Sequence, residues 1–258
     1  MLFRIFEYLR YFFTAKSGYG IHSPFAYDFY MKVVRSKETF PETLNEIEDI
    51  RRSLLNSGEK IQVTDYGTGA LQSKTLRKVS LLASSYANPK KDAFLIYRMI
   101  RYFKPAVILE LGTSLGLTTL YMSKAADKGR VFSLEGCPET ARLAKQNFTA
   151  CGMDINLQIG NIDLVLPELF GKDFRPEFVF FDANHTKEAT LRYFNLCLPH
   201  VNEKTVFVFD DIYWSEGMKE AWLSIISYPE INLSIDIFHM GIVFFKKNSA
   251  KQHYVLKY

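Results

Sequence analysis

Apolar and polar residues along this chain follow two periods, one typical of strands and one typical of helices. Short runs dominated by apolar residues predict strands at 107–111, 130–135, 157–159, 178–182 and 206–211. Helical spacing follows the first two runs, at 117–126 and 138–148. Two more runs, 233–238 and 241–245, flank a tight turn and predict an antiparallel hairpin. The pattern therefore predicts an α/β protein with a doubly wound, mostly parallel sheet of seven strands.

The first 85 residues have a different pattern, helical and rich in aromatic residues. We expect helices at 1–13, 25–34 and 41–55, a strand and glycine turn at 61–69, a helix near 75–84 and another at 90–103. The first helix is amphipathic, with Arg4, Glu7 and Arg10 at helical spacing, and it is too short and too charged to span a bilayer. We expect no stable membrane insertion, and packing on the main domain or on a second copy in a homodimer, with a role at a membrane surface as the alternative. The expected division is a helical extension, 1–85, and a main domain, 86–258.

A glycine turn follows the strand at 107–111 and leads directly into a helix. Gly112 and Gly116 let the backbone approach a ligand closely, and the N–H groups at the start of the helix suit a polar or charged small molecule. The dinucleotide fingerprint G-x-G-x-x-G would need glycine at 114 and 117, where the chain has Ser114 and Leu117. This difference argues against a nicotinamide-dependent oxidoreductase, which stays as an alternative.

An acidic residue ends the next strand, 23 positions after Gly112. Glu135 would lie at the carboxyl edge of the neighbouring strand, where a carboxylate can accept hydrogen bonds from two ribose hydroxyls. Asn161, after the following strand, has both a hydrogen-bond donor and an acceptor for a ligand, and Asp163 is the alternative there.

The spelling E-L-G-x-x-x-G-x-T, from Glu110 to Thr118, resembles motif I of the class I S-adenosylmethionine (SAM) methyltransferases, in the form found in catechol-type O-methyltransferases. The resemblance runs from about Tyr86 to Phe245 and implies a Rossmann-like fold with SAM as cofactor. The cofactor-binding residues that we predict are Glu110, Gly112, Thr113, Ser114, Gly116, Thr118, Glu135, Gly136, Asn161, Ile162 and Asp182.

Acids also end the fourth and fifth predicted strands, at Asp182 and at the pair Asp210 and Asp211. Since ligands bind beyond the carboxyl ends of parallel strands, we expect these acids to converge on one crevice. The resemblance implies a divalent cation, Mg²⁺ or Mn²⁺, on Asp182 and Asp210, with Asp211 where that family has Asn. Two carboxylates about 4 Å apart repel by about 4 kcal/mol at an effective dielectric of 20, so such a cluster needs a cation, a proton or solvent. A structural interpretation stays open, in which Asp210 faces solvent and Asp211 caps a helix.

The family's catalytic lysine is replaced by His185 in this chain. Histidine is mostly unprotonated at neutral pH and can act as a general base, so we predict His185 and Asp182 as catalytic residues. The predicted activity is methyl transfer from SAM to a small-molecule acceptor, most simply a hydroxyl oxygen. The alternatives are a metal-free N- or O-methyltransferase and a non-catalytic protein with the SAM-binding fold.

The charge and the cysteine content of the chain bear on its partners and its cellular location. Lysine and arginine number 32 against 28 acidic residues, no basic stripe is present, and we expect no nucleic-acid partner. The three cysteines have no metal-ligand spacing, which favours a reducing, cytoplasmic location.

Overall fold

The computed structural model of the chain describes residues 2–65, 73–171, 174–246 and 250–258. The chain divides into two compact units. We call them the terminal unit, Met1–Lys37 with Phe174–Tyr258, and the central unit, Glu38–Asp173.

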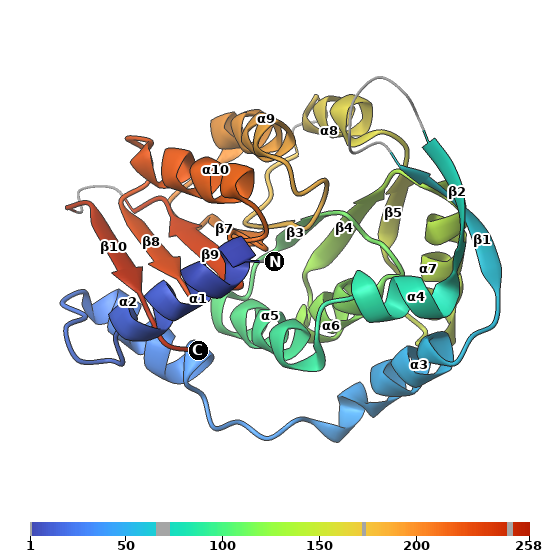
Figure 1. Cartoon of the computed structure of the whole chain (residues 1–258), viewed down its shortest axis with the longest axis horizontal. Helices are drawn as coiled ribbons and strands as arrows, with labels where there is room; N and C mark the ends of the chain where they lie inside the picture. Colours follow the sequence, from blue (N-terminus) through green and yellow to red (C-terminus); the bar gives the residue numbers. More distant parts are fainter. Residues whose placement is uncertain (1, 66–72, 172–173, 247–249) are drawn as a thin grey trace. The chain divides into compact units, whose positions relative to one another are not determined.

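In its described residues, the terminal unit contains five strands: β6 (Phe178–Phe181), β7 (Val206–Asp210), β8 (Leu233–Asp236), β9 (Met240–Phe244) and β10 (Gln252–Val255). β6 and β7 are parallel, β9 runs antiparallel to both β7 and β8, and β10 is parallel to β8. This direction pattern puts the carboxyl ends of β6, β7, β8 and β10 at one edge. Helices α9 (Lys187–Cys197) and α10 (Glu216–Ser227) lie side by side (Figure 1).

Aromatic side chains fill the core of the terminal unit. Phe178, Phe180, Phe207 and Phe209 are almost completely buried, and the ring of Phe181 stacks on that of Phe209 with 4.3 Å between centroids. A strand buried on both faces keeps consecutive apolar residues, which explains why the runs at 178–181 and 206–209 contain no alternating polar positions.

Helix α1 (Leu2–Thr14) is tied to the other end of the chain. The Tyr11 hydroxyl donates to the carbonyl of Leu256 at 2.6 Å and accepts from the backbone N–H of Tyr258 at 3.0 Å. Tyr11 and Ala15 form a small buried cluster with Phe238. A short α-helix, α2 (Pro24–Phe29), follows, capped by the Ser23 hydroxyl and continued by one π-helical turn, Tyr30–Val34.

The central unit contains three parallel strands, β3 (Val107–Leu111), β4 (Arg130–Glu135) and β5 (Asn156–Ile159), with β4 in the middle. Their carboxyl ends therefore meet at one edge. Its helices include α3 (Asn45–Leu55), preceded by a 3₁₀ turn at Glu42–Leu44, then α5 (Lys90–Phe103), α6 (Leu117–Ala125), α7 (Pro138–Ala150) and α8 (Ile162–Phe170). Glu48 on α3 joins two of these helices, because its buried carboxylate accepts from the Tyr121 hydroxyl of α6 at 2.6 Å.

One prediction for the sequence before residue 86 needs correction. Residues 75–78, predicted as the start of a helix, belong to strand β2 (Ser73–Lys78), and the helix α4 begins only at Val79 and ends at Ser85. β2 pairs antiparallel with β1 (Lys60–Asp65), so the hydrogen bonds of this ladder outweigh the helical preference of leucine, arginine and lysine. The predicted strand at 61–65 is confirmed as part of β1, while the predicted glycine turn at 66–69 lies outside the described residues.

The α/β fold class is confirmed. The seven predicted strands correspond to β3, β4, β5, β6, β7, β8 and β9, and the C-terminal hairpin is β8 with β9. β10 was not predicted, and it covers the edge of β8 that the sequence pattern leaves open. The predicted boundary at residue 85 differs from the division into compact units and stays a prediction about where the family resemblance begins.

Candidate functional site

The carboxyl edge of the central unit carries most of the residues predicted to bind a cofactor. The turn from Gly112 to Gly116 follows β3, Glu135 ends β4, and Gly160 and Asn161 follow β5. Since the three strands are parallel neighbours, these segments lie at the same edge.

The turn after β3 has three residues in the left-handed region of backbone conformation. Gly112 has a φ of 100°, Ser114 of 50° and Gly116 of 78°. No side chain fits at Gly116, because a Cβ there would overlap the ring of Phe148 and would also lie 3.2 Å from the Cβ of Ala144. Gly116 is therefore needed for the close packing of the turn on α7.

Glu135, at the end of β4, is hydrogen-bonded to the turn that follows β3. Its Oε2 accepts from the backbone N–H of Ser114 at 2.8 Å, and its Oε1 accepts from the backbone N–H of Cys137 at 2.8 Å. Burial raises the pKa of this carboxyl, and the backbone hydrogen bonds from Cys137, Ser114 and Gly136 oppose that rise. A carboxylate fixed by backbone donors is already oriented to accept further hydrogen bonds from a ligand.

Glu110 lies in a different environment from Glu135. It is completely buried, and its Oε2 accepts from the hydroxyls of Thr119 and Ser133, while Ser133 also bonds to Thr113. This network joins β3, β4 and α6 close to the turn. Cofactor contact by Glu110 stays a prediction, and the contacts present here give it the task of holding the turn in place.

The other predicted residues of the central unit surround the same edge. Asn161 is the N-cap of α8, where its Oδ1 accepts from the N–H of Asp163 at 2.9 Å, and Ile162 is buried as the first residue of that helix. Thr118, in the first turn of α6, is buried and accepts from the Asn88 amide at 3.3 Å. Asn161 rather than Asp163 thus caps the helix, and its amide N–H₂ group and the second lone pair of Oδ1 are left for a ligand.

The terminal unit carries the remaining predicted residues at the carboxyl ends of β6 and β7. Asp182 follows β6, and its Oδ1 lies 3.4 Å from Nε2 of His185. Asp210 ends β7 and is mostly buried, opposite Met240 of the antiparallel strand β9. The side chains of Asp182 and His185 are 14% and 30% exposed, so both can be reached by a small molecule.

Asp211 lies beside Arg4, which the sequence analysis named only as a charged position of the first helix and not as a site residue. It has a φ of 52°, and its Oδ1 lies 3.8 Å from the guanidinium of Arg4 on α1. The same guanidinium lies over the ring of Trp214, 4.6 Å from its centroid. The spacing of Arg4, Glu7 and Tyr11 was the available signal, because it puts all three on one face of the first helix.

The metal site on Asp182, Asp210 and Asp211 stays a prediction, because these donors do not form a three-ligand group. Among the residues that the structure describes, no three His, Cys, Asp or Glu side chains are grouped so that they could hold a metal ion. Asp211 has a cationic neighbour in Arg4, and Asp182 has His185. We derive no step through a divalent cation.

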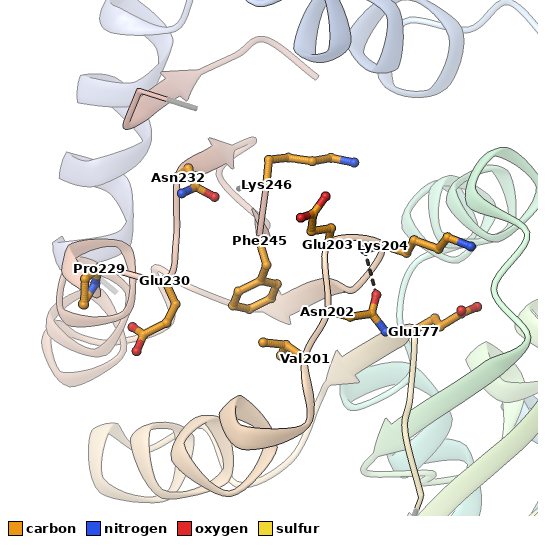
Figure 2. Close-up of a pocket in the computed structure, with 10 residues that line it drawn as sticks. All are labelled: Glu177, Val201, Asn202, Glu203, Lys204, Pro229, Glu230, Asn232, Phe245 and Lys246. Carbon is orange, nitrogen blue, oxygen red and sulfur yellow. Dashed lines mark hydrogen bonds between the residues drawn. The ribbon is translucent and has the colours of Figure 1, made fainter. Parts of the chain in front are cut away.

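A hollow of about 800 Å³ lies at the opposite edge of the terminal unit's sheet (Figure 2). Its lining comes from segments next to the amino ends of β6, β7 and β8 and the end of β9: Glu177, Val201, Asn202, Glu203, Lys204, Pro229, Glu230, Asn232, Phe245 and Lys246. None of the predicted site residues is among them. Because ligands of open α/β sheets bind at the carboxyl ends of the strands, we do not assign the cofactor to this hollow.

Comparison with known families identifies one matching segment, which spans residues of both units. Residues 109–212 match the family model described as a methyltransferase domain. This segment is similar to that family, and we refer to residues 109–212 as the methyltransferase domain. It begins within β3 and ends just beyond Asp211, so it includes every residue that we predicted for the cofactor, for catalysis and for a metal.

Relatives of the methyltransferase domain include two bacterial catechol O-methyltransferases. That of Niastella koreensis is 34% identical over 109 residues, which are 41% of this chain and 48% of the relative. That of Mycobacterium tuberculosis is 30% identical over 114 residues, 43% of this chain and 50% of the relative. The chain thus spans about half the length of the curated relatives it matches. The resemblance to the catechol-type family is confirmed.

Solved structures agree on the fold of the methyltransferase domain. A SAH-bound methyltransferase from Podospora anserina superposes with a TM-score of 0.63 and 15% sequence identity, over 88% of this chain and 97% of that one. At this identity the likeness concerns the Rossmann-like fold alone. Over the described residues, the structure contains no helix that combines the length and apolarity needed to cross a membrane.

Proposed function

We propose that this protein transfers the methyl group of SAM to a hydroxyl oxygen of a small molecule. The observation that carries the proposal is the carboxyl edge of the central unit. There the left-handed turn from Gly112 to Gly116 and the carboxylate of Glu135 are joined by the Ser114 hydrogen bond. The relatives that match the methyltransferase domain support the same chemistry.

Each part of the cofactor has a group that could hold it at this edge. The ribose hydroxyls would donate to Glu135, the amino-acid end would lie over the turn at Gly112 to Gly116, and the adenine would be read by Asn161. The bound cofactor supplies a methyl group already activated on a sulfonium sulfur. The protein's task is then to align the acceptor oxygen with that carbon, which contributes about 7–11 kcal/mol in well-oriented reactions, and to remove the acceptor's proton.

We propose His185 as the proton acceptor and Asp182 as its positioning partner. Nε2 of His185 is directed at the Asp182 carboxylate, 3.4 Å away. A hydrogen bond from Nε2–H to that carboxylate would leave Nδ1 to take the hydroxyl proton as the oxygen–carbon bond forms. The expectation that these two residues share a crevice with the cofactor stays part of this proposal.

A reducing, cytoplasmic location remains part of the proposal as well. Cys137, Cys151 and Cys197 are all buried and all free thiols. Burial also raises the pKa of Cys151 and Cys197, which makes both thiols less reactive.

Two measurements test the proposal. The first is binding of S-adenosylhomocysteine to the full chain by calorimetry, with NAD as the control ligand, where we expect binding of the first compound only. The second is transfer of labelled methyl from SAM to a panel of phenols and alcohols. We expect Asp182→Ala to abolish transfer. Lack of S-adenosylhomocysteine binding would overturn the assignment, and binding without transfer on a broad panel would make the protein a non-catalytic binder.

A further inference from the structure

Helix α1 is docked by its polar side and presents its apolar side to solvent. Glu7 and Tyr11 are buried, whereas Leu2, Ile5, Phe6, Leu9, Phe12 and Phe13 are 48–85% exposed. We call these six residues the outward face of α1. Leu2, Ile5, Phe6, Leu9 and Phe13 recur every three or four positions, so they form one stripe along the helix.

Specific contacts on the inner side fix this orientation. The Lys219 ammonium bonds to the Glu7 carboxylate at 2.6 Å, the Tyr11 hydroxyl bonds to the Leu256 carbonyl, and Arg4 lies beside Asp211. Rotation of the helix to bury its phenylalanines would expose a salt bridge and break these hydrogen bonds. The contacts on the inner side therefore keep the apolar stripe exposed in the folded terminal unit.

Positive charge is concentrated in the segment that contains α1. The segment 1–37 has six basic and two acidic residues, an excess of four, which equals the formal net charge of the whole chain. Arg10 and Lys32 have side chains that are 62% and 66% exposed, and Lys16 and Arg35 are exposed as well. One of the two acids, Glu7, is buried against Lys219.

We propose that the outward face of α1 binds the surface of an anionic phospholipid bilayer. A helix with aromatic and aliphatic residues on one side and arginine or lysine beside them lies in the plane of the lipid headgroups. Negative lipid headgroups complement the basic residues of 1–37. A second copy of the chain would bring the same positive charges together across a symmetric contact, so charge favours the bilayer over a homodimer.

Flotation of the full chain with vesicles tests this inference. We expect the protein to float with phosphatidylcholine–phosphatidylglycerol vesicles, to bind pure phosphatidylcholine weakly, and to dissociate in high salt. Phe6→Ser with Leu9→Ser and Phe13→Ser should lower binding at least about tenfold. Arg10→Gln and Lys16→Gln should lower it about fivefold each. The matched control is Leu164→Ser, a leucine that is 67% exposed on α8 of the central unit, and it should bind as the unchanged protein does.

Thermal unfolding and light scattering separate the proposal from its alternatives. The triple variant should melt like the unchanged protein, since its three positions are 50–80% exposed. If it fails to fold, Phe13→Ser alone, at 80% exposure, is compared with Leu164→Ser for vesicle binding instead. The proposal is overturned if the unchanged protein does not float, if the outward-face variant floats equally well, or if the chain is a dimer that this variant dissociates.

Discussion

The carboxylate of Glu135 accepts a hydrogen bond from the backbone N–H of Ser114, with 2.8 Å between the two atoms. The bond joins the end of β4 to the turn after β3, and the left-handed conformation of Ser114 turns its N–H toward the acid. The two parts of the proposed cofactor site are thus connected before any ligand arrives.

Glu135→Gln should weaken S-adenosylhomocysteine binding by about tenfold to a hundredfold. The amide loses a charged acceptor, and hydrogen bonds to charged groups contribute about 1.5–3 kcal/mol each. Calorimetry measures the affinity, with Glu139→Gln as the matched control, because Glu139 is a half-exposed carboxylate in the first turn of α7. Equal affinities of the two variants would remove Glu135 from the cofactor site.

Gly116→Ala should destabilise the fold by about 2–4 kcal/mol, since it combines a left-handed backbone with a methyl group forced against the Phe148 ring. Gly152→Ala is the matched control, because Gly152 has a φ of 62° but open space around its Cβ. The control should lose only the backbone part, about 1 kcal/mol. Chemical denaturation measures both, and Phe148→Leu should partly rescue Gly116→Ala. An equal loss in the two glycine variants would show that packing at Phe148 is unimportant.

His185→Asn should lower turnover about 10²- to 10⁴-fold without weakening S-adenosylhomocysteine binding, because asparagine cannot take the acceptor's proton. His200→Asn, at the amino edge of the terminal unit's sheet, is the control and should retain full activity. Single-turnover methyl transfer measures the chemical step directly. Unchanged transfer by His185→Asn would assign proton removal to another group or to solvent.

Turnover should survive treatment with EDTA, since Asp211 lies beside Arg4 and the three acids do not form a three-ligand site in the described structure. The assay is methyl transfer with and without chelator, followed by addition of MgCl₂. Loss of activity on chelation and recovery with Mg²⁺ would restore the cation implied by the family resemblance, with Asp182 and Asp210 as its first candidate ligands.

Stability should depend on Asp236 between about pH 4 and pH 6. Burial raises the pKa of this carboxyl from 3.8 to about 6, against the opposing hydrogen bonds from Tyr213 and Phe238. Between those two values the folded state retains a proton that the unfolded chain loses, so rising pH lowers the free energy of unfolding by up to about 1.4 kcal/mol per pH unit.

Asp236→Asn should remove that contribution, and thermal melts from pH 4 to 7 compare it with the unchanged protein. Asp154→Asn, on an exposed acid of the central unit, is the control and should keep the slope. Parallel pH profiles for Asp236→Asn and the unchanged protein would contradict the assignment.

The sheet could be predicted from the sequence because its strands are buried on both faces. Phe178–Phe181 and Val206–Asp210 are nearly unbroken apolar runs, and such runs need no knowledge of their neighbours. β10 escaped prediction because Gln252–Val255 is short and mixed, and it is a strand only because β8 pairs with it. Residues 73–78 form β2 for the same reason.

The sequence predicts that the candidate site residues follow strand ends, but it does not predict which contacts each of them makes. Glu110 and Glu135 both end a strand next to a glycine-rich segment, yet Glu110 is completely buried among hydroxyl donors and Glu135 is bonded to the turn itself. Helix periodicity marks α1 as amphipathic but cannot say which side faces inward. The partners Lys219 and Leu256, more than 200 positions away, decide it.

The attachment of α1 has a consequence for the order of events during synthesis. Tyr11 finds its acceptor, the Leu256 carbonyl, 245 positions later in the chain. Because translation proceeds from the amino end, α1 leaves the ribosome long before the segment around Leu256 has been made, and its phenylalanines are then exposed to solvent. The helix is thus made well before its partner segment and docks only after that segment has been made, and until then it is accessible to chaperones or to an apolar surface.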